Sequence, residues 1–177
     1  MRKILLMLAL LGTLLVFASC GKETGAPEGM RILSVEDNYV VYIPERWVID
    51  EKSVLYAHAP DYRLGETKAF YASVQVFEHK LDGTMDDFIP EYISELKSEF
   101  KSAFDNDVPL DYKNGEKTGK TLTYSIKKAD GRELYKSTFI VHNDTVIELR
   151  YIAMEIDGLF EKNLSDYNMI VENIILK

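Results

Sequence analysis

Cys20 is the one cysteine of the chain. Its thiol is a reactive group, and the residues before it explain its position. Cys20 follows a positively charged start at Arg2 and Lys3 and an apolar run that extends to Phe17. Charge, an apolar stretch and small residues, in this order, are typical of a secretory signal peptide. The run is shorter than the roughly 20 residues that a membrane-spanning helix needs. We therefore predict export, with residues 1–19 removed as a signal peptide.

The last four residues of this segment resemble the lipobox of bacterial lipoproteins. They are Phe17-Ala18-Ser19-Cys20, and they depart from the usual pattern in that Leu is commoner where Phe17 stands. The resemblance implies that Cys20 becomes the amino-terminal residue and carries a thioether-linked diacylglycerol and an acyl chain. Several chains anchor a protein firmly, because each buried CH₂ adds about 0.8 kcal/mol. An ordinary secretion signal with a chance cysteine is the alternative.

Residues 20–32 combine glycine, proline and charge without an apolar period, so we expect a flexible tether there. Residues 33–177 then form a single domain. Residue 21 is glycine rather than the aspartate that resembles an inner-membrane retention signal in enteric-type bacteria. We expect a lipid-anchored protein of the cell envelope. The anchor would lie in the outer membrane of a Gram-negative cell, and otherwise on the outer face of the cytoplasmic membrane.

The composition limits the partners of this domain. Hydrophobic residues make up 46% of the chain and charged residues 28%, which is typical of a globular protein. The formal charge is -8, and it becomes more negative by two when the segment with Arg2 and Lys3 is removed. An acidic domain is repelled by nucleic-acid phosphates and by anionic headgroups. We therefore expect no nucleic-acid partner, and membrane attachment only through lipid on Cys20.

The remaining chemistry-bearing residues form no recognisable catalytic or metal motif. His58, His79 and His142 lie in three separate segments, whereas a structural zinc site needs four ligands. The sequence contains no nucleophile elbow and no glycine-rich phosphate loop. We predict no enzymatic activity, no cofactor and no metal. A hydrolase with a site assembled from distant segments is the less favoured alternative, and a pocket that joins a histidine to an acid and a nucleophile would support it.

Aromatic side chains are numerous and provide the candidates for partner binding. The chain has 11 Tyr, 8 Phe and 1 Trp. Four of them, Tyr56, Tyr62, Phe70 and Tyr71, would suit an exposed patch for an envelope protein partner, because tyrosine is enriched in interface cores. Packing within the sheet is the alternative for these four. Trp47, close after Pro44, is expected to fill the core beside the sheet.

The periodicity of apolar residues predicts an antiparallel sheet with helices. Two-residue alternation and β-rich runs predict strands over 39–43, 53–57, 69–77, 121–127, 132–141 and 145–154. The dipeptides Asp130-Gly131 and Asn143-Asp144 are turn signals.

Two segments have helical spacing. The first is 84–104, with a capped start at Thr84. Pro90 requires either a start nearer Asp87 or a kink. The second covers 160–174, and Ser165-Asp166 would divide it into a turn and a final helix. The predicted fold class is α+β, an antiparallel sheet flanked by helices.

The segment Tyr42-Ile43-Pro44-Glu45-Arg46-Trp47 resembles the hydrophobic-Pro-x-x-Trp opening of Mog1/PsbP-like domains. The central helix, the meander around Asp130-Gly131 and the terminal helix extend the resemblance over 39–177. It implies an α/β/α sandwich and no catalytic residues, because the fold serves roles as different as photosystem assembly and small-GTPase binding. We predict a non-enzymatic envelope lipoprotein that binds or helps to assemble another protein. A carrier of a small ligand or lipid is the alternative, and it requires a cavity between sheet and helix.

Overall fold

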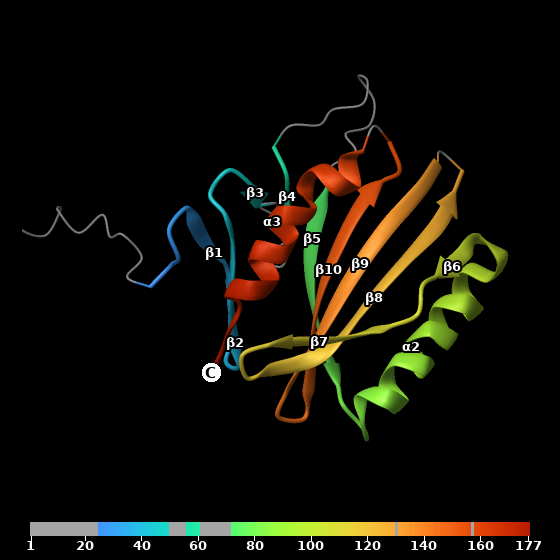
Figure 1. The fold of residues 1–177 in the computed structure, drawn as a ribbon, viewed down its shortest axis with the longest axis horizontal. Coiled ribbons are helices and arrows are strands. Elements are labelled where there is room, and N and C mark those ends of the chain that lie inside the picture. Colours follow the sequence, from blue (N-terminus) through green and yellow to red (C-terminus); the bar gives the residue numbers. More distant parts are fainter. Residues whose placement is uncertain (1–24, 50–55, 61–71, 130, 157) are drawn as a thin grey trace, which may run out of the picture.

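The computed structural model describes residues 25–49, 56–60, 72–129, 131–156 and 158–177 (Figure 1). The described strands are β1 (Met30–Val35), β2 (Tyr39–Pro44), β3 (Val48–Ile49), β4 (Tyr56–His58), β5 (Ser73–Lys80), β6 (Phe104–Asn106), β7 (Leu110–Asn114), β8 (Lys117–Lys128), β9 (Gly131–His142), β10 (Thr145–Met154) and β11 (Ile175–Leu176). The helices are α2 (Met85–Phe100) and α3 (Leu159–Asn173), with a 3-10 turn at Lys101–Ala103.

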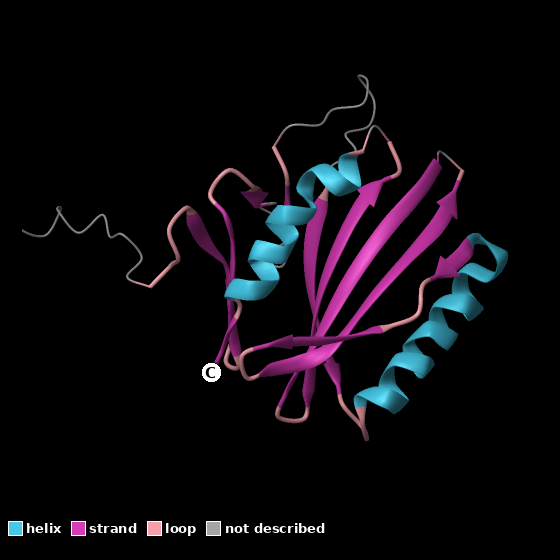
Figure 2. Ribbon diagram, viewed as in Figure 1, coloured by secondary structure: helices cyan, strands magenta, loops and turns pink. Residues whose placement is uncertain are grey.

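The strands form two antiparallel sheets. The larger has eight strands in the order β3-β4-β5-β10-β9-β8-β6, with β7 pairing to β8 off this path. The smaller has the order β1-β2-β11, so its central strand lies between the first and the last strand of the described chain. Figure 2 shows the long strands of the larger sheet, with α2 at the right and α3 on the left-hand side. The predicted α+β class, an antiparallel sheet flanked by helices, is confirmed.

The alternation along β10 explains why one helix covers each face of the larger sheet. Ile147, Leu149 and Tyr151 belong to the apolar core that includes α3. Val146 belongs to the second core, which contains α2 residues. Because neighbouring side chains in a strand point to opposite faces, Glu148 and Arg150 share the α2 face with Val146. The structure is therefore an α/β/α sandwich with two cores.

The meander β8–β10 matches the sequence prediction. β9 and β10 pair in an unbroken register from Thr145 opposite His142, so Asn143-Asp144 is the turn between them. Leu122, Tyr124 and Ile126 lie together in the α2 core, as their alternation predicted. The predicted strands 53–57 and 69–77 lie partly outside the described residues, and their described parts are in β4 and β5.

The prediction for α2 is correct at the start of the helix and wrong at its end. The helix ends at Phe100 and Phe104 begins β6, so the predicted helix was too long. The capped start at Thr84 is confirmed, since α2 begins at Met85 after this N-cap, and the alternative of a start nearer Asp87 is ruled out. The Asp87 carboxylate accepts hydrogen bonds from the Thr84 hydroxyl at 2.6 Å and from its backbone N–H at 3.2 Å. Pro90 lies inside the helix and is exposed to solvent.

Two other sequence predictions fail for tertiary reasons. The break at Ser165-Asp166 is wrong, because α3 is continuous from Leu159 to Asn173 and Asp166 is buried against another part of the chain. The predicted tether of residues 20–32 overlaps the fold. β1 begins at Met30, whose side chain is buried in the α3 core. The folded part therefore starts three residues earlier than residue 33.

Candidate functional site

A groove of about 590 Å³ lies between α2 and the sheet. Its walls come from the end of β5, from α2, and from the middle strands of the larger sheet. The lining residues are His79, Lys80, Asp82, Phe88, Glu91, Tyr92, Glu95, Leu96, Glu99, Phe100, Tyr124, Ile126, Tyr135 and Arg150. This volume is in the range of ligand-binding pockets. The groove is therefore the candidate functional site.

A buried carboxylate organises the base of the groove. Glu148 is fully buried, and its Oε1 accepts hydrogen bonds from Ser137 Oγ at 2.6 Å, Arg150 Nε at 2.7 Å and Tyr92 Oη at 3.0 Å. Its Oε2 contacts His79 Nε2 at 2.8 Å and accepts from Arg150 at 3.0 Å. A carboxylate has only acceptors, so His79 Nε2 carries the hydrogen of this contact. Five donors thus surround one charge that water does not reach.

The sheet register brings these residues together. Ser137 on β9 pairs directly with Arg150 on β10, two residues beyond Glu148. On the other side of β10, His79 of β5 pairs with Val146, two residues before Glu148. All of them lie on the α2 face, since their positions differ by even numbers of residues. Tyr92 reaches the same carboxylate from the buried side of α2. The network therefore joins three strands and a helix.

The electrostatics keep this carboxylate charged. Burial alone would raise the pKa of Glu148, but hydrogen bonds from His79 and Arg150, and the charge of Arg150, lower it to about 2. The pKa of Tyr92 is raised, first by burial and then by the negative charge of Glu148, so its hydroxyl stays protonated. The hydrogen bonds to Glu148 hold the pKa of Arg150 above its ordinary value, although burial opposes this.

Aromatic rings form much of the remaining surface of the groove. Tyr124 and Tyr135 stack with ring centroids 4.6 Å apart, and Tyr92 stacks on Phe88 at 6.0 Å. The Arg150 guanidinium lies 4.1 Å from the centre of the Phe77 ring beside the groove. Such faces attract cations and the alkyl stems of long side chains. The groove therefore combines an aromatic floor with a fixed ion pair, in which the charges of Glu148 and Arg150 neutralise each other.

The geometry does not match that of a catalytic triad. In a triad the histidine lies between the nucleophile and the acid. Here the carboxylate of Glu148 lies between His79 and Ser137, and the fully buried Ser137 donates its hydrogen bond to the acid. A carboxylate with a pKa of about 2 is also a weak general base at neutral pH. The pocket joins a histidine, an acid and a hydroxyl, but in an order unsuited to hydrolysis.

The described residues offer neither a metal site nor a membrane-spanning helix. No group of three or more His, Cys, Asp or Glu side chains within the described ranges is arranged to hold a metal ion. In the same part of the chain, no helix has both the length and the apolar character to cross a membrane.

The predicted histidine positions divide between the groove and other surfaces. Of the three histidines, only His79 lines the groove; it lies near the end of β5, and its Nε2 contacts Glu148. His58 Nδ1 lies 3.2 Å from the Ala59 carbonyl oxygen, and His142 Nε2 lies 2.7 Å from that of Lys177.

Most of the predicted binding residues lie outside the described residues. Tyr62, Phe70 and Tyr71 do so, as does Cys20. Tyr56 is half-buried on β4, opposite Gln75 of β5, and does not line the groove. The aromatic patch and the lipid anchor therefore stay predictions.

Glu148 and Arg150 were missed at the sequence level. The signal was present, because both charges interrupt the face of β10 opposite the apolar series Ile147, Leu149 and Tyr151. An acid and a base two residues apart on one strand face are positioned to pair. The sequence did not reveal that His79 and Ser137 are their neighbours.

The Pro-x-x-Trp segment connects the smaller sheet to α3. Trp47 is fully buried, as predicted, and its backbone N–H donates to the Pro44 carbonyl at 2.9 Å. Its indole Nε1 donates to Asp166 Oδ2 on α3 at 2.7 Å, and Arg46 pairs with the same oxygen. The segment thus fixes one helix against one face of the sandwich, with the groove on the other face.

These features, an antiparallel sheet between two helices and a buried tryptophan after a Pro-x-x turn, define a sandwich of the Mog1/PsbP type. Solved structures agree. The chain is similar to the solution structure of cyanobacterial PsbP (CyanoP) from Synechocystis sp. PCC 6803, with a TM-score of 0.60 and 12% identity, over 92% of this chain and 99% of that chain. The chain therefore has a PsbP-like fold.

Two further structures have the same arrangement. One is PA94 of Pseudomonas aeruginosa, a protein of unknown function described as a putative regulator, with a TM-score of 0.57 and 11% identity over 84% of this chain and 97% of that chain. The other is LpqN of Mycobacterium tuberculosis, involved in cell envelope biogenesis, with a TM-score of 0.52 and 14% identity over 87% of each chain. No protein-family model and no curated protein sequence matches the chain. These three structures are a PsbP protein, a putative regulator and a cell-envelope protein, and none of them is named as an enzyme.

Proposed function

We propose that this protein is an envelope lipoprotein, anchored through Cys20, whose domain binds another envelope protein in the groove along α2 without catalysing a reaction. The carrying observation is the groove itself, which has an aromatic base and lies on the sheet face opposite α3 and its core. The PsbP-like fold and the envelope role named for LpqN support the location.

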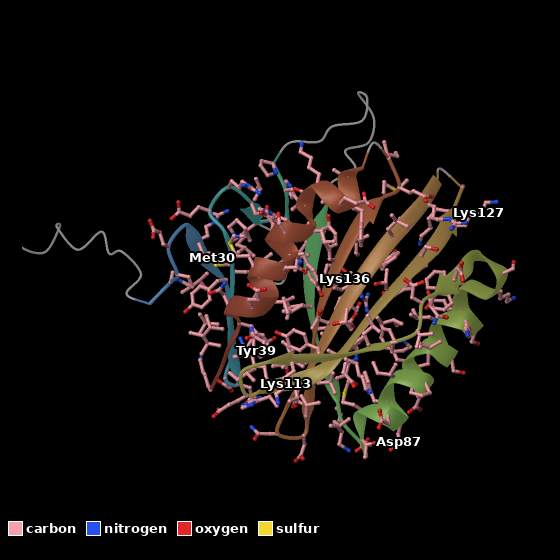
Figure 3. All side chains as sticks on the ribbon, viewed as in Figure 1. Met30, Tyr39, Asp87, Lys113, Lys127 and Lys136 are labelled. Carbon is pink, nitrogen blue, oxygen red and sulfur yellow. The ribbon has the colours of Figure 1, made fainter. Side chains whose placement is uncertain are left out.

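The position of the groove suits an anchored protein. The chain enters the domain at β1, whose first residue is Met30. In Figure 3, Met30 and Asp87 of α2 lie at opposite sides of the molecule. A domain held from the β1 side would turn its groove away from the anchor, where another protein can reach it. A membrane-facing groove would be a poor place for the acids along α2.

The chemistry of the groove favours binding over catalysis or lipid transport. The hydroxyls of Ser137 and Tyr92 contact the buried ion pair, but they donate to a carboxylate whose pKa is about 2, which is a weak general base at neutral pH. Acyl chains would require a dry apolar cavity, whereas this groove contains a guanidinium, a histidine and several carboxylates. A partner with both polar and apolar side chains fits this surface better than a lipid tail does.

The test is site-specific photocrosslinking in cells. A photoreactive amino acid replaces Asp82, an exposed residue at the groove, and in a control strain it replaces Lys162, an exposed residue of α3 outside the groove. We expect a discrete crosslinked envelope protein from position 82 and none from position 162, with both variants in the membrane fraction. No crosslink at position 82, or the same crosslink at both positions, would contradict the proposal.

A further inference from the structure

The charges of the groove do not balance, and the imbalance is confined to one wall. Both cations of the lining already have carboxylate partners. Lys80 pairs with Asp82 at 2.6 Å, and Arg150 pairs with the buried Glu148 at 2.7 Å. The lining residues that remain charged are acids of α2.

These acids are Glu91, Glu95 and Glu99, all exposed. None of the three carboxylates is joined by a hydrogen bond or ion pair to another residue in the described part of the chain. They recur at every fourth position, so they form a row on one side of α2. At a rise of 1.5 Å per residue, neighbouring members are about 6 Å apart along the helix. The groove therefore has one wall with three evenly spaced negative charges and no cation of its own to meet them.

Next to the row of acids, the floor of the groove is aromatic, and such a surface suits the alkyl stem of a lysine or arginine side chain. Phe88, Tyr92 and Phe100 come from the same helix, and Tyr124 and Tyr135 come from the sheet. Lysine and arginine lay their alkyl stems on such surfaces while their charged ends reach outward. An aromatic face also attracts the cation directly. Two independent features of the groove, its charge and its aromatic base, therefore point to the same chemistry.

We infer that the partner segment bound in this groove is an extended, basic stretch of polypeptide with lysine or arginine at alternate positions. This rests on the proposed function and specifies its partner. In a strand, alternate residues lie on one face about 6.5 Å apart, which matches the spacing of the glutamates. The basic ends contact the acid wall, and the residues between them face away from it.

The test measures binding of a fluorescent peptide, Lys-Val-Lys-Thr-Lys-Val, to the full mature protein purified in detergent. Fluorescence anisotropy is followed at low and at physiological salt, because exposed charge contacts weaken as salt rises. A peptide of the same composition with its three lysines contiguous is the sequence control. We expect the alternating peptide to bind more tightly than the control peptide. Added salt, and the glutamate substitutions described below, should each weaken binding of the alternating peptide.

The groove variant carries E91Q, E95Q and E99Q, which remove three charges with little change of shape. The matched control carries E45Q, E116Q and E161Q, at exposed acids away from the groove, and has the same net charge. We expect the groove variant to lose about tenfold in affinity, as three exposed ion pairs allow, and the control to lose little. Equal losses, or no loss in the groove variant, would overturn the inference.

Two further results separate this inference from the proposed function. Spermidine is added as a small competitor, and displacement of the peptide by equimolar spermidine would overturn the choice of a polypeptide.

The groove variant is also tested by crosslinking from position 82 in cells. An undiminished crosslink would overturn the basic-segment inference and leave the proposed function standing, whereas a wild-type groove that crosslinks to nothing defeats the proposed function itself.

Discussion

Trp47 and Asp166 are 119 residues apart in the chain and share a hydrogen bond of 2.7 Å between the indole Nε1 and Oδ2. Both side chains are buried, one beside the smaller sheet and the other on α3. A buried donor without a partner costs free energy, so the indole N–H depends on the Asp166 carboxylate as its acceptor. The contact explains why an aspartate is accommodated inside a helix at a position that the sequence presents as a break.

Replacing Trp47 by alanine should strongly destabilise the domain. The ring is fully buried, and its removal leaves a cavity and takes one of two hydrogen-bond donors, Trp47 and Arg46, away from Asp166. We expect a loss of about 3–5 kcal/mol in the free energy of unfolding. Urea unfolding followed by circular dichroism measures this loss. The neighbouring Glu45→Ala, at an exposed position, serves as the control, and an equally small change in both variants would contradict the core role of Trp47.

Replacing Asp166 should test the hydrogen bond separately from the packing. Asp166→Ala leaves the buried indole N–H without an acceptor, and we expect a loss of about 1–3 kcal/mol. Asp166→Asn keeps an oxygen that can accept from Trp47 but removes the charge that meets Arg46, so it should cost less. The two unfolding free energies are compared at one pH. A larger loss for asparagine than for alanine would assign the effect to something other than this bond.

The buried Glu148 predicts how stability depends on pH. Its pKa is about 2 in the folded protein, below its ordinary value of 4.5. The stability that it contributes is therefore fully present above pH 4.5, and it is lost as the pH falls toward 2, because the unfolded chain binds the proton first. The shift corresponds to about 3 kcal/mol. Urea unfolding at a series of pH values between 7 and 2 should show this decline.

The variant that tests this assignment is Glu148→Gln. It leaves the partly buried Arg150 without its counter-charge, so we expect a loss of about 3–5 kcal/mol at pH 7 and a shallower decline in acid. Glu116→Gln, at an exposed turn position, should keep the wild-type profile. An unchanged slope for Glu148→Gln would mean that other carboxylates cause the acid sensitivity.

Lipid attachment can be tested by removing one sulfur. Cells are grown with an alkyne-bearing fatty acid, and wild type is compared with Cys20→Ala. We expect the label and membrane sedimentation only in the wild type, because the thioether and the acylated amino terminus both depend on Cys20. Both proteins should melt at the same temperature, since the fold begins at Met30. Equal labelling of the two proteins would refute lipidation at this residue.

The sequence revealed those parts of the fold that depend on local periodicity. The long strands of the meander alternate over ten or more residues, and their turns contain Gly, Asn and Asp, so both could be predicted. The short strands β3, β6 and β11 could not, because two or three residues carry no period. Their strand conformation comes from their partners in the sheet.

The candidate site illustrates the same limit. His79 lies 69 residues before Glu148, and the two meet only because β5 pairs with β10. The alternation of apolar residues identified the apolar face of β10, but it did not indicate which residues contact Glu148 and Arg150 on the other face. The histidine therefore looked isolated, and the groove had no sequence signature. A predicted strand order would have been needed to find it.

The smaller sheet has a consequence for biogenesis. β2 lies between β1 and β11, and Ile175 pairs with Val40 across nearly the whole domain. This pairing cannot form before the final residues have been made, and contacts so distant in sequence close slowly. The smaller sheet is therefore expected to form late, after β11 has been synthesised. Under the proposed export, β11 would pair with β2 only after it has crossed the membrane.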